Sequence, residues 1–462
     1  MDGEVRINPY LSGNFAPVRS EDDFDLVVKG EIPRELRGTL YRTGPNPQFE
    51  PRGEYHWFAG DGMIHAFHVE DGRVSYRNRY VRTPKWRLEN EAGRALFGSF
   101  GNPMATDPSA IGKDSGVANT NIVFHAGRLL ALEEGHMPFE MEPRSLNSKG
   151  YVEQYRGRTT AHPKIDPKTG EMVWFGYGIG DMPFGTGISY GLTNAAGEVV
   201  RRDDFQAPYS SMIHDFLVTE NYALFPVLPL TGSLDRAMKG LPAFAWEPDK
   251  GSHVAVMRRD ADVSTIRWFN APACYVFHPM NAWEEDGKIL ADVFRYDNAP
   301  LFPNADGSPG KKSAARLVRW TFDLAGNSDA IREEAIDDLD GEFPRFDERY
   351  AGLSYRHGWY AADPGAAKTI KQTAIAHLDQ KTGKRQVYKL TGGDMTSEPV
   401  FTPRSPGAEE GDGWVTAVVW RAAENRSDFL VFDALDVAKG PIGLAELPRR
   451  VPFGFHGNWV AD

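Results

Sequence analysis

The chain has 462 residues, of which 41% are hydrophobic and 12% aromatic, and its 64 acidic residues outnumber 52 Lys and Arg, giving a formal net charge of −12. This charge argues against a nucleic-acid partner, because phosphate binding needs basic surfaces. No apolar run is long enough for a membrane-spanning helix, so we expect a soluble globular protein. The N-terminus lacks the pattern of a secretory signal and Cys274 is the single cysteine, which predicts a reducing, cytoplasmic location.

Short apolar runs separated by turn residues recur along the chain and predict antiparallel strand pairs. Residues 63–81 contain two such runs around the turn sequence EDGR, and residues 121–132 contain two around AG. Both are typical of hairpins. The same pattern returns in three further segments, at residues 166–175, 284–294 and 379–390.

These hairpins indicate an all-β fold. Length alone would allow about three domains, but no linker or compositional shift divides the sequence, so we expect a single domain over residues 1–462. Many small antiparallel sheets without strand–helix alternation favour radial repetition, because a propeller protects sheet edges that would otherwise be exposed. We therefore predict a β-propeller. The repeat is too degenerate for the blades to be counted from the sequence.

Two segments interrupt the strand pattern, at residues 89–113 and 228–249. Both mix helical and irregular sequence and are rich in Leu, Phe and Met. We expect them to form a helical and loop cap over one propeller face. Such a cap encloses a lipophilic substrate, lies against a membrane surface, or packs inward as ordinary core, and the sequence leaves these three readings open.

Four of the 12 histidines stand in unusual local settings and form the candidate metal site: His162, His214, His278 and His456. They are far apart in the chain, unlike the ligands of a helix or zinc finger. In a propeller, however, the innermost strand of each blade reaches the central axis, so ligands from different blades converge. A ring of imidazoles points to a transition metal such as Fe, Cu, Ni or Zn, since Ca²⁺ and Mg²⁺ prefer oxygen ligands.

Metal-binding imidazoles usually donate their second ring N–H to a carboxylate, which fixes the tautomer. Glu134, Glu342 and Glu398 are the candidates for this role. Taken singly, each is also an ordinary surface or salt-bridging glutamate, and only the local sequences distinguish them.

Those local sequences resemble the carotenoid cleavage oxygenase family. The resemblance rests on the four histidine contexts, on EFPR at 342–345 and EPVFTPR at 398–404, and on RGTLYRTGPNPQF and HWFAGDGMIHAF at 37–49 and 56–67. It extends from about residue 8 to residue 460.

Membership would imply a seven-bladed propeller with a cap and a non-haem Fe²⁺ on its axis, held by His162, His214, His278 and His456. The three glutamates would accept hydrogen bonds from the last three of these, in an order that the resemblance does not fix, while His162 would have no carboxylate partner. The implied reaction splits a conjugated C=C bond with O₂ into two carbonyl products. It needs no catalytic residue beyond the metal site.

Within the family, the segments at 93–103, 116–134 and 267–285 resemble a bacterial group that cleaves lignostilbenes and isoeugenol. That group binds a 4-hydroxyphenyl ring through a Tyr and a Lys, whose positions match Phe100 and Glu133. Phe cannot donate a hydrogen bond, and Glu would repel a phenolate. We therefore rank an apocarotenoid first as substrate, and a stilbene or phenylpropene as the alternative.

The remaining substrate contacts are expected from aromatic walls that exclude water, namely Phe58, Phe100 and Phe277. His136 lies close to Glu134 in sequence and is a further candidate for lining the substrate tunnel. The expected partners are O₂ and a hydrophobic alkene, with peripheral membrane contact through the cap as an open possibility.

Three other functions compete with this reading. A propeller without chemistry would bind no metal tightly, a Ca²⁺-dependent hydrolase would need Asp, Asn or Glu on its axis, and an isomerohydrolase would act on an ester at a membrane. The imidazole set disfavours the first two, and nothing in the sequence selects the third.

Overall fold

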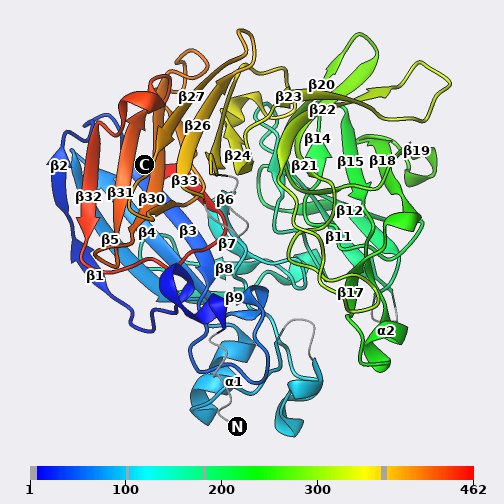
Figure 1. Ribbon diagram of the computed structural model, residues 1–462, viewed down its shortest axis with the longest axis horizontal. Coiled ribbons are helices and arrows are strands. Elements are labelled where there is room, and N and C mark those ends of the chain that lie inside the picture. Colours follow the sequence, from blue (N-terminus) through cyan, green and yellow to red (C-terminus); the bar gives the residue numbers. More distant parts are fainter. Residues whose placement is uncertain (1–7, 100–102, 181–183, 366–371) are drawn as a thin grey trace.

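The computed structural model describes residues 8–99, 103–180, 184–365 and 372–462. In these residues, seven antiparallel sheets of four to six strands form the blades of a propeller, and one two-stranded sheet lies outside them. The predicted all-β class and the implied number of blades are thus confirmed (Figure 1). The five predicted hairpins are confirmed as well, for example by the pairing of residue 121 with 132 and of 63 with 80.

We number the blades along the chain, starting with the first that is built from consecutive strands. Blade 1 has β6 (Asn121–His125), β7 (Arg128–Leu132), β8 (Phe139–Met141) and β9 (Ser148–Tyr151). Blade 2 has β10 (Lys164–Ile165), β11 (Met172–Ile179), β12 (Gly187–Thr193) and β13 (Val199–Gln206). Blade 3 has β14 (Leu217–Val218), β15 (Tyr222–Val227), β18 (Ser252–Arg258) and β19 (Arg267–Ala271).

In the next two blades, as in the first three, the strands are paired in chain order, beginning with the innermost strand. Blade 4 has β20 (Tyr275–Glu285), β21 (Lys288–Tyr296), β22 (Arg316–Asp323) and β23 (Arg332–Asp337). Blade 5 has β24 (Gly341–Phe346), β25 (His357–Ala362), β26 (Ala374–Asp379) and β27 (Lys384–Lys389).

The two ends of the chain close the ring. Blade 6 has β28 (Met395–Thr396) and β29 (Val400–Pro403), both paired with β30 (Gly413–Arg421), then β31 (Arg426–Asp433), β32 (Gly443–Leu447) and the N-terminal β2 (Val27–Gly30). Blade 7 joins the C-terminal β33 (Gly457–Ala461) to β3 (Gly38–Pro45), β4 (Gly62–Glu70), β5 (Arg73–Tyr80) and β1 (Asp23–Asp25). This exchange of terminal strands leaves no gap in the circle of sheets.

The helices are short. The α-helices are α1 (Pro84–Ala92) and α2 (Leu234–Met238). The 3₁₀ turns are η1 (Pro9–Leu11), η2 (Gly13–Phe15), η3 (Trp57–Ala59), η4 (Pro103–Ala105), η5 (Pro108–Ala110), η6 (Glu153–Tyr155), η7 (Pro248–Lys250), η8 (Val263–Thr265), η9 (Glu348–Tyr350) and η10 (Val437–Lys439). None of the helices in the described ranges has the length and apolar character that a membrane crossing requires.

The segments expected to form a cap contain several of the elements that lie outside the blades. The end of α1, with η4 and η5, falls in residues 89–113; β16 (Leu230–Gly232), α2, β17 (Phe244–Trp246) and η7 fall at or near residues 228–249. In Figure 1, α1, α2 and β17 all lie along the lower side of the molecule, away from the upper ends of the blades.

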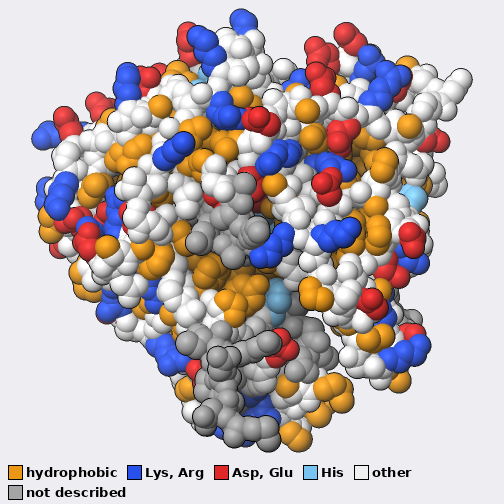
Figure 2. All heavy atoms as spheres, in the orientation of Figure 1, with side chains coloured by type: hydrophobic (Ala, Val, Ile, Leu, Met, Phe, Trp, Pro, Cys, Tyr) orange, Lys and Arg blue, Asp and Glu red, His pale blue; other side chains and the backbone are white. Residues whose placement is uncertain are grey.

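Charges of both signs are mixed over the face drawn in Figure 2. Hydrophobic side chains lie between them. The largest hydrophobic side chains are instead buried between the blades, where Trp174, Trp320, Trp359 and Trp414 are all less than 2% exposed. These packed sheets form the rigid frame that positions the central residues.

Candidate metal centre

Each blade places one ionisable residue at the centre of the ring. His162, His214 and His456 lie just before the innermost strands β10, β14 and β33, and His278 lies within the innermost strand β20. Blades 1, 5 and 6 contribute Glu134, after β7, Glu342, within β24, and Glu398, between β28 and β29. The structure therefore brings together all seven residues that the sequence singled out.

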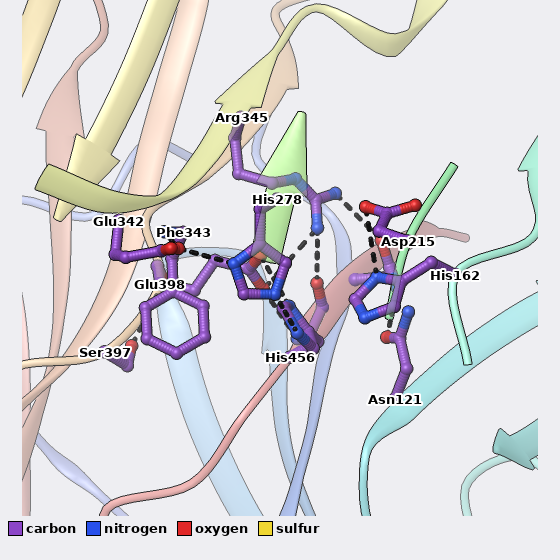
Figure 3. Close-up of polar contacts among 12 residues, drawn as sticks. Asn121, His162, Asp215, His278, Glu342, Phe343, Arg345, Ser397, Glu398 and His456 are labelled. Carbon is purple, nitrogen blue, oxygen red and sulfur yellow. Dashed lines mark hydrogen bonds and ion pairs between the residues drawn. The ribbon is translucent and has the colours of Figure 1, made fainter. Parts of the chain in front are cut away.

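The four imidazoles converge on one small space through their Nε2 atoms. Successive Nε2 separations are 3.1 Å from His162 to His214, 3.0 Å from His214 to His278 and 3.1 Å from His278 to His456. One ligand atom from each lies within 4.8 Å of the others, and all four side chains are buried, at most 9% exposed. Figure 3 shows the rings of His162, His278 and His456 facing a common space.

Three glutamates fix the orientation of these rings. His214 Nδ1 lies 2.5 Å from Glu134 Oε1, and His278 Nδ1 lies 2.5 Å from Glu342 Oε2. His456 Nδ1 lies 3.0 Å from Glu398 Oε1. This supplies the order of pairing that the resemblance left open.

The tautomers follow from these contacts. An ionised carboxylate only accepts hydrogen bonds, so each paired Nδ1 is the donor and the opposite Nε2 carries a lone pair. Lone pairs about 3 Å apart in a buried space repel one another unless a cation lies between them. The arrangement therefore has the donor set of a metal site.

The Nε2 spacing also bears on the geometry of that site. With metal–nitrogen bonds of about 2.1 Å, neighbouring ligands of an octahedral ion are about 3.0 Å apart, whereas a tetrahedral ion would separate them by about 3.4 Å. The observed 3.0–3.1 Å fits the octahedral case. An octahedral ion held by these four imidazoles would keep two coordination positions for small ligands.

His162 is held differently. Its Nδ1 lies 3.6 Å from Asp215 Oδ2, too far for a hydrogen bond, while Asp215 pairs at 2.8 Å with Lys164 Nζ. The backbone N–H of His162 donates instead to Thr160 Oγ1 at 2.9 Å. His162 thus has no direct carboxylate hydrogen bond, and its nearest acid is already neutralised by a lysine.

Burial and charge keep the imidazoles available as neutral ligands. Burial, together with the other three histidines, holds the pKa of His162 well below its usual value, and burial lowers the pKa of His456 to about 4. Burial also opposes ionisation of Glu398, but His456 and Arg345 outweigh it and lower the pKa of that carboxyl to about 2. His278 is the exception, because Glu342 outweighs burial and raises its pKa.

A second layer of donors holds the glutamates. Tyr177 Oη donates to Glu134 Oε2 at 2.5 Å, and Tyr296 Oη donates to Glu342 Oε1 at 3.0 Å. Glu398 Oε2 accepts the N–H of Gly457 at 2.8 Å and lies 3.6 Å from Arg345 Nη1. With both oxygens engaged, each carboxylate has little freedom to turn away from its imidazole.

Irregular pairing in β24 helps to aim these groups. The β24–β25 register shifts between Glu342 and Arg345, and Phe343 between them has φ +54°. Residues other than glycine rarely adopt this backbone conformation. It is tolerated where the surrounding structure holds it in place. As a result, the Phe343 ring stacks on His278 at 5.3 Å and meets His456 edge-on at 5.2 Å.

A cavity of about 440 Å³ opens onto three of the four histidines, His214, His278 and His456. Its lining is mainly aromatic and apolar and includes Phe58, Phe277, Phe343 and Phe455. Phe277 meets the His214 ring edge-on at 5.2 Å. A cavity of this size and character suits an apolar small molecule held beside the histidine cluster.

The expected substrate contacts have different positions. Phe58 and Phe277 line the cavity, and so does Glu133. Phe100 lies outside the described residues. His136 lies outside the lining: its Nδ1 forms a 3.0 Å ion pair with Glu133 Oε1, and its ring stacks on Tyr151.

Glu133 is therefore not a free anion facing the cavity. Its Oε1 accepts the N–H groups of Val117 at 2.7 Å and Ala118 at 3.2 Å, in addition to the His136 contact. Burial opposes the ionisation of Glu133, but His136 outweighs it and lowers the pKa of the carboxyl. The repulsion of a phenolate that we expected from Glu133 assumed an uncompensated charge, whereas His136 and two backbone N–H groups compensate it.

Sequence reasoning did not find the second layer. Tyr177 and Tyr296 belong to ordinary blade strands, β11 and β21, and nothing local marks them as partners of Glu134 and Glu342. Arg345 stands in the EFPR segment that supported the family resemblance, so a signal for it was present but was not assigned a role.

The chain is similar over nearly its whole length to known proteins. A family model described as RPE65, retinal pigment epithelial membrane protein, matches residues 15–461. Isoeugenol monooxygenase from Pseudomonas nitroreducens is 39% identical over 472 residues, covering 98% of each chain. Carotenoid 9,10(9',10')-cleavage dioxygenase 1 from Arabidopsis thaliana is 34% identical over 496 residues, covering 98% of this chain and 90% of the other. The crystal structure of Pseudomonas brassicacearum lignostilbene dioxygenase is 37% identical, with a TM-score of 0.94 over 98% of both chains.

Proposed function

The chain belongs to the RPE65 and carotenoid cleavage oxygenase family of alkene-cleaving oxygenases, and we propose that its substrate is an aromatic alkene of the stilbene or phenylpropene class. The reaction adds the two atoms of O₂ across one C=C bond and splits it into two carbonyl compounds. The observation that supports this best is the four-histidine centre opening directly onto an aromatic cavity.

Similarity reverses the order of substrates that the sequence favoured. The apocarotenoid was ranked first because Phe100 and Glu133 replace the phenol-binding Tyr and Lys. The relatives named for isoeugenol and lignostilbene resemble this chain more than the carotenoid-cleaving relative does, at 39% and 37% identity against 34%. The structure also weakens the argument from Glu133, since His136 and two backbone N–H groups already compensate its charge.

We propose Fe²⁺ as the ion held by His162, His214, His278 and His456. Neutral imidazoles suit iron, and an open position on such a centre is typical of non-haem Fe(II) oxygenases. A bound Fe²⁺ would supply the redox chemistry that allows O₂ to react with an alkene.

The protein's own residues have three tasks in this reaction. Glu134, Glu342 and Glu398 keep the Nδ1 protons of their histidines in place, so that the Nε2 atoms stay available as ligands. Phe58 and Phe277 hold one face of the alkene and exclude water. Adding O₂ across the C=C bond neither takes up nor releases a proton, so no described side chain is required to remove one. The alkene itself supplies the electrons.

We further propose that the segments at 89–113 and 228–249 act as the cap of this cavity. Phe244 of β17 contributes to its lining, which supports a position over the cavity for the second segment. O₂ and the alkene would be the partners. We also propose peripheral contact of this cap with a membrane surface.

A panel of substrates tests the proposal. Fe²⁺-loaded protein is incubated in air with isoeugenol, 4-hydroxystilbene and an apocarotenal, and the aldehydes are identified by mass spectrometry. We expect aromatic aldehydes from one or both of the first two. Exclusive formation of apocarotenoid aldehydes would restore the apocarotenoid, and no aldehyde from any of the three would refute alkene cleavage within these classes.

A further inference from the structure

The cavity contains one cation that the metal site does not use. Among the described residues that line it, Arg158 is the single Lys or Arg. The acidic residues of the lining already have partners: Glu134 and Glu342 face His214 and His278, and Glu133 faces His136. The positive charge of Arg158 is thus not required to neutralise them.

Arg158 is solvent-exposed, and few of its guanidinium donors have a protein partner. The one hydrogen bond that its side chain makes among the described residues runs from Nη1 to the carbonyl oxygen of Gly178, at 3.1 Å. A guanidinium has five N–H donors in a planar fork. At least four remain for a ligand.

Strand β11 is shaped to accommodate this arginine. Gly178 has φ +65°, and a Cβ atom there would lie 2.7 Å from Arg158 Nη1. A Cβ atom at Gly176 would lie 2.2 Å from the carbonyl oxygen of Arg158. Gly176 therefore leaves space for the backbone of Arg158, whereas at Gly178 the flexible end of the arginine side chain could move aside, so that glycine is favoured there by its positive φ.

The same strand connects Arg158 to the metal centre. Tyr177 lies between the two glycines, lines the cavity and donates its hydroxyl to Glu134, which orients His214. The β11–β12 register shifts between Tyr177 and Ile179, next to Gly178. This irregular end of β11 therefore contributes both the hydroxyl that holds Glu134 and the carbonyl oxygen that accepts a hydrogen bond from Arg158.

We propose that Arg158 is a specificity-determining residue that binds an anionic oxygen group, a carboxylate or a phenolate, on the aromatic end of the substrate. This inference rests on the proposed function, since it names the class of aromatic alkene that the cavity accepts. A planar fork matches a carboxylate in two parallel hydrogen bonds, and it binds a phenolate through one or two. Arg158 would thereby replace the Lys whose position is taken here by Glu133.

Binding of ligands that cannot be cleaved tests this directly. Bibenzyl-4-carboxylate has the stilbene skeleton without the alkene, and bibenzyl-4-carboxamide is its neutral match. Their affinities for the Fe²⁺-loaded protein are measured by calorimetry without O₂, for the wild type, Arg158→Met, Arg158→Lys and the control Arg156→Met. Arg156 is exposed, as Arg158 is, and lies two residues away, but it is outside the cavity lining.

We expect Arg158→Met to weaken carboxylate binding by about 10- to 100-fold, as for other hydrogen bonds to charged groups. Carboxamide binding should change less than about threefold, Arg158→Lys should retain part of the affinity, and Arg156→Met should match the wild type. Three results would overturn the proposal. Arg158→Met could weaken the binding of carboxylate and carboxamide equally, it could weaken the binding of neither, or neither the carboxylate nor the phenolate could bind at all.

A second arm identifies the anion. If the group is a phenolate, 4-hydroxybibenzyl should bind more tightly at pH 10 than at pH 7 in an Arg158-dependent manner, because a phenol ionises near pH 10. Since none of these ligands is cleaved, the arms test Arg158 even if the substrate panel yields no aldehyde. A failure of the proposed function and a failure of this inference are therefore distinguishable.

Discussion

His456 Nδ1 lies 3.0 Å from Glu398 Oε1, although the two residues are 58 positions apart in the chain and belong to blades 7 and 6. Glu342 and His278 join blades 5 and 4 in the same way. The metal centre is thus assembled only when blades from both halves of the chain have closed the ring. Metal binding and the closed fold should stabilise each other.

Loss of one of these carboxylates should weaken metal binding. In Glu398→Gln the side chain keeps its size but loses the charge that holds His456, so we expect metal affinity to fall about 10- to 100-fold. Metal content after competition with a chelator measures this. Glu409→Gln, at an exposed position, serves as control and should behave as the wild type; equal metal retention in both variants would contradict a role for Glu398.

The hydroxyl behind Glu342 should act through that glutamate. Tyr296→Phe removes the 3.0 Å hydrogen bond to Glu342 Oε1 and should lower the free energy of unfolding by about 1–3 kcal/mol. It should also weaken metal binding several-fold. Tyr190→Phe removes a comparable bond to the Arg259 carbonyl oxygen, away from the metal, and should affect stability alone. If metal affinity is unaltered in Tyr296→Phe, Tyr296 contributes to stability but does not position Glu342 for metal binding.

The Glu133–His136 pair should make stability depend on pH. Burial would lower the pKa of His136, but Glu133 outweighs it and raises the value from 6.5 to about 9. The stabilisation from a raised histidine pKa is complete below pH 6.5 and is lost as the pH rises through 9. The pKa of Glu133 is lowered from 4.5, so its contribution is present above pH 4.5.

Glu133→Gln isolates this charge, because the amide oxygen still accepts the N–H groups of Val117 and Ala118. At pH 6 we expect the variant to be about 1–2 kcal/mol less stable than the wild type, with the difference shrinking by pH 10. Urea unfolding at both pH values measures it. A difference that grows between pH 6 and pH 10 would have the wrong sign for this pair.

Much of the fold and of the metal site was predictable from the sequence, for physical reasons. Hairpins such as residues 121–132 are local, and their turn residues identify them. The four histidines and three glutamates stand in distinctive segments, so resemblance located them although spacing did not. Asp215 near His162 and Tyr177 behind Glu134 depend on contacts between blades, which no local pattern encodes. The Glu133–His136 pair is local, three residues apart in the chain, but its ion pair was not predicted. The similarity to the group that cleaves lignostilbenes and isoeugenol was predicted from the sequence, but the substrate ranking departed from it because Phe100 and Glu133 were weighed without the partners of Glu133.

Metal should also stabilise the whole protein. A ligand that binds only the folded state raises stability by mass action, by about 2.7 kcal/mol at a free concentration 100 times Kd. Adding Fe²⁺ to the metal-free protein should therefore raise Tm, and His278→Ala should abolish the increase. His253→Ala, whose imidazole lies in blade 3 beside Asn270, is the control. A rise in Tm that persists in His278→Ala would place the binding site elsewhere.

Isotope labelling tests the central claim most directly, namely that the four-histidine centre uses O₂ to split an aromatic alkene. Fe²⁺-loaded protein is given 4-hydroxystilbene under ¹⁸O₂, and the aldehydes are reduced at once to prevent exchange with water. We predict one ¹⁸O atom in each of the two aromatic products, and no product from His278→Ala. Unlabelled products, or labelled products formed equally by His278→Ala, would contradict the account.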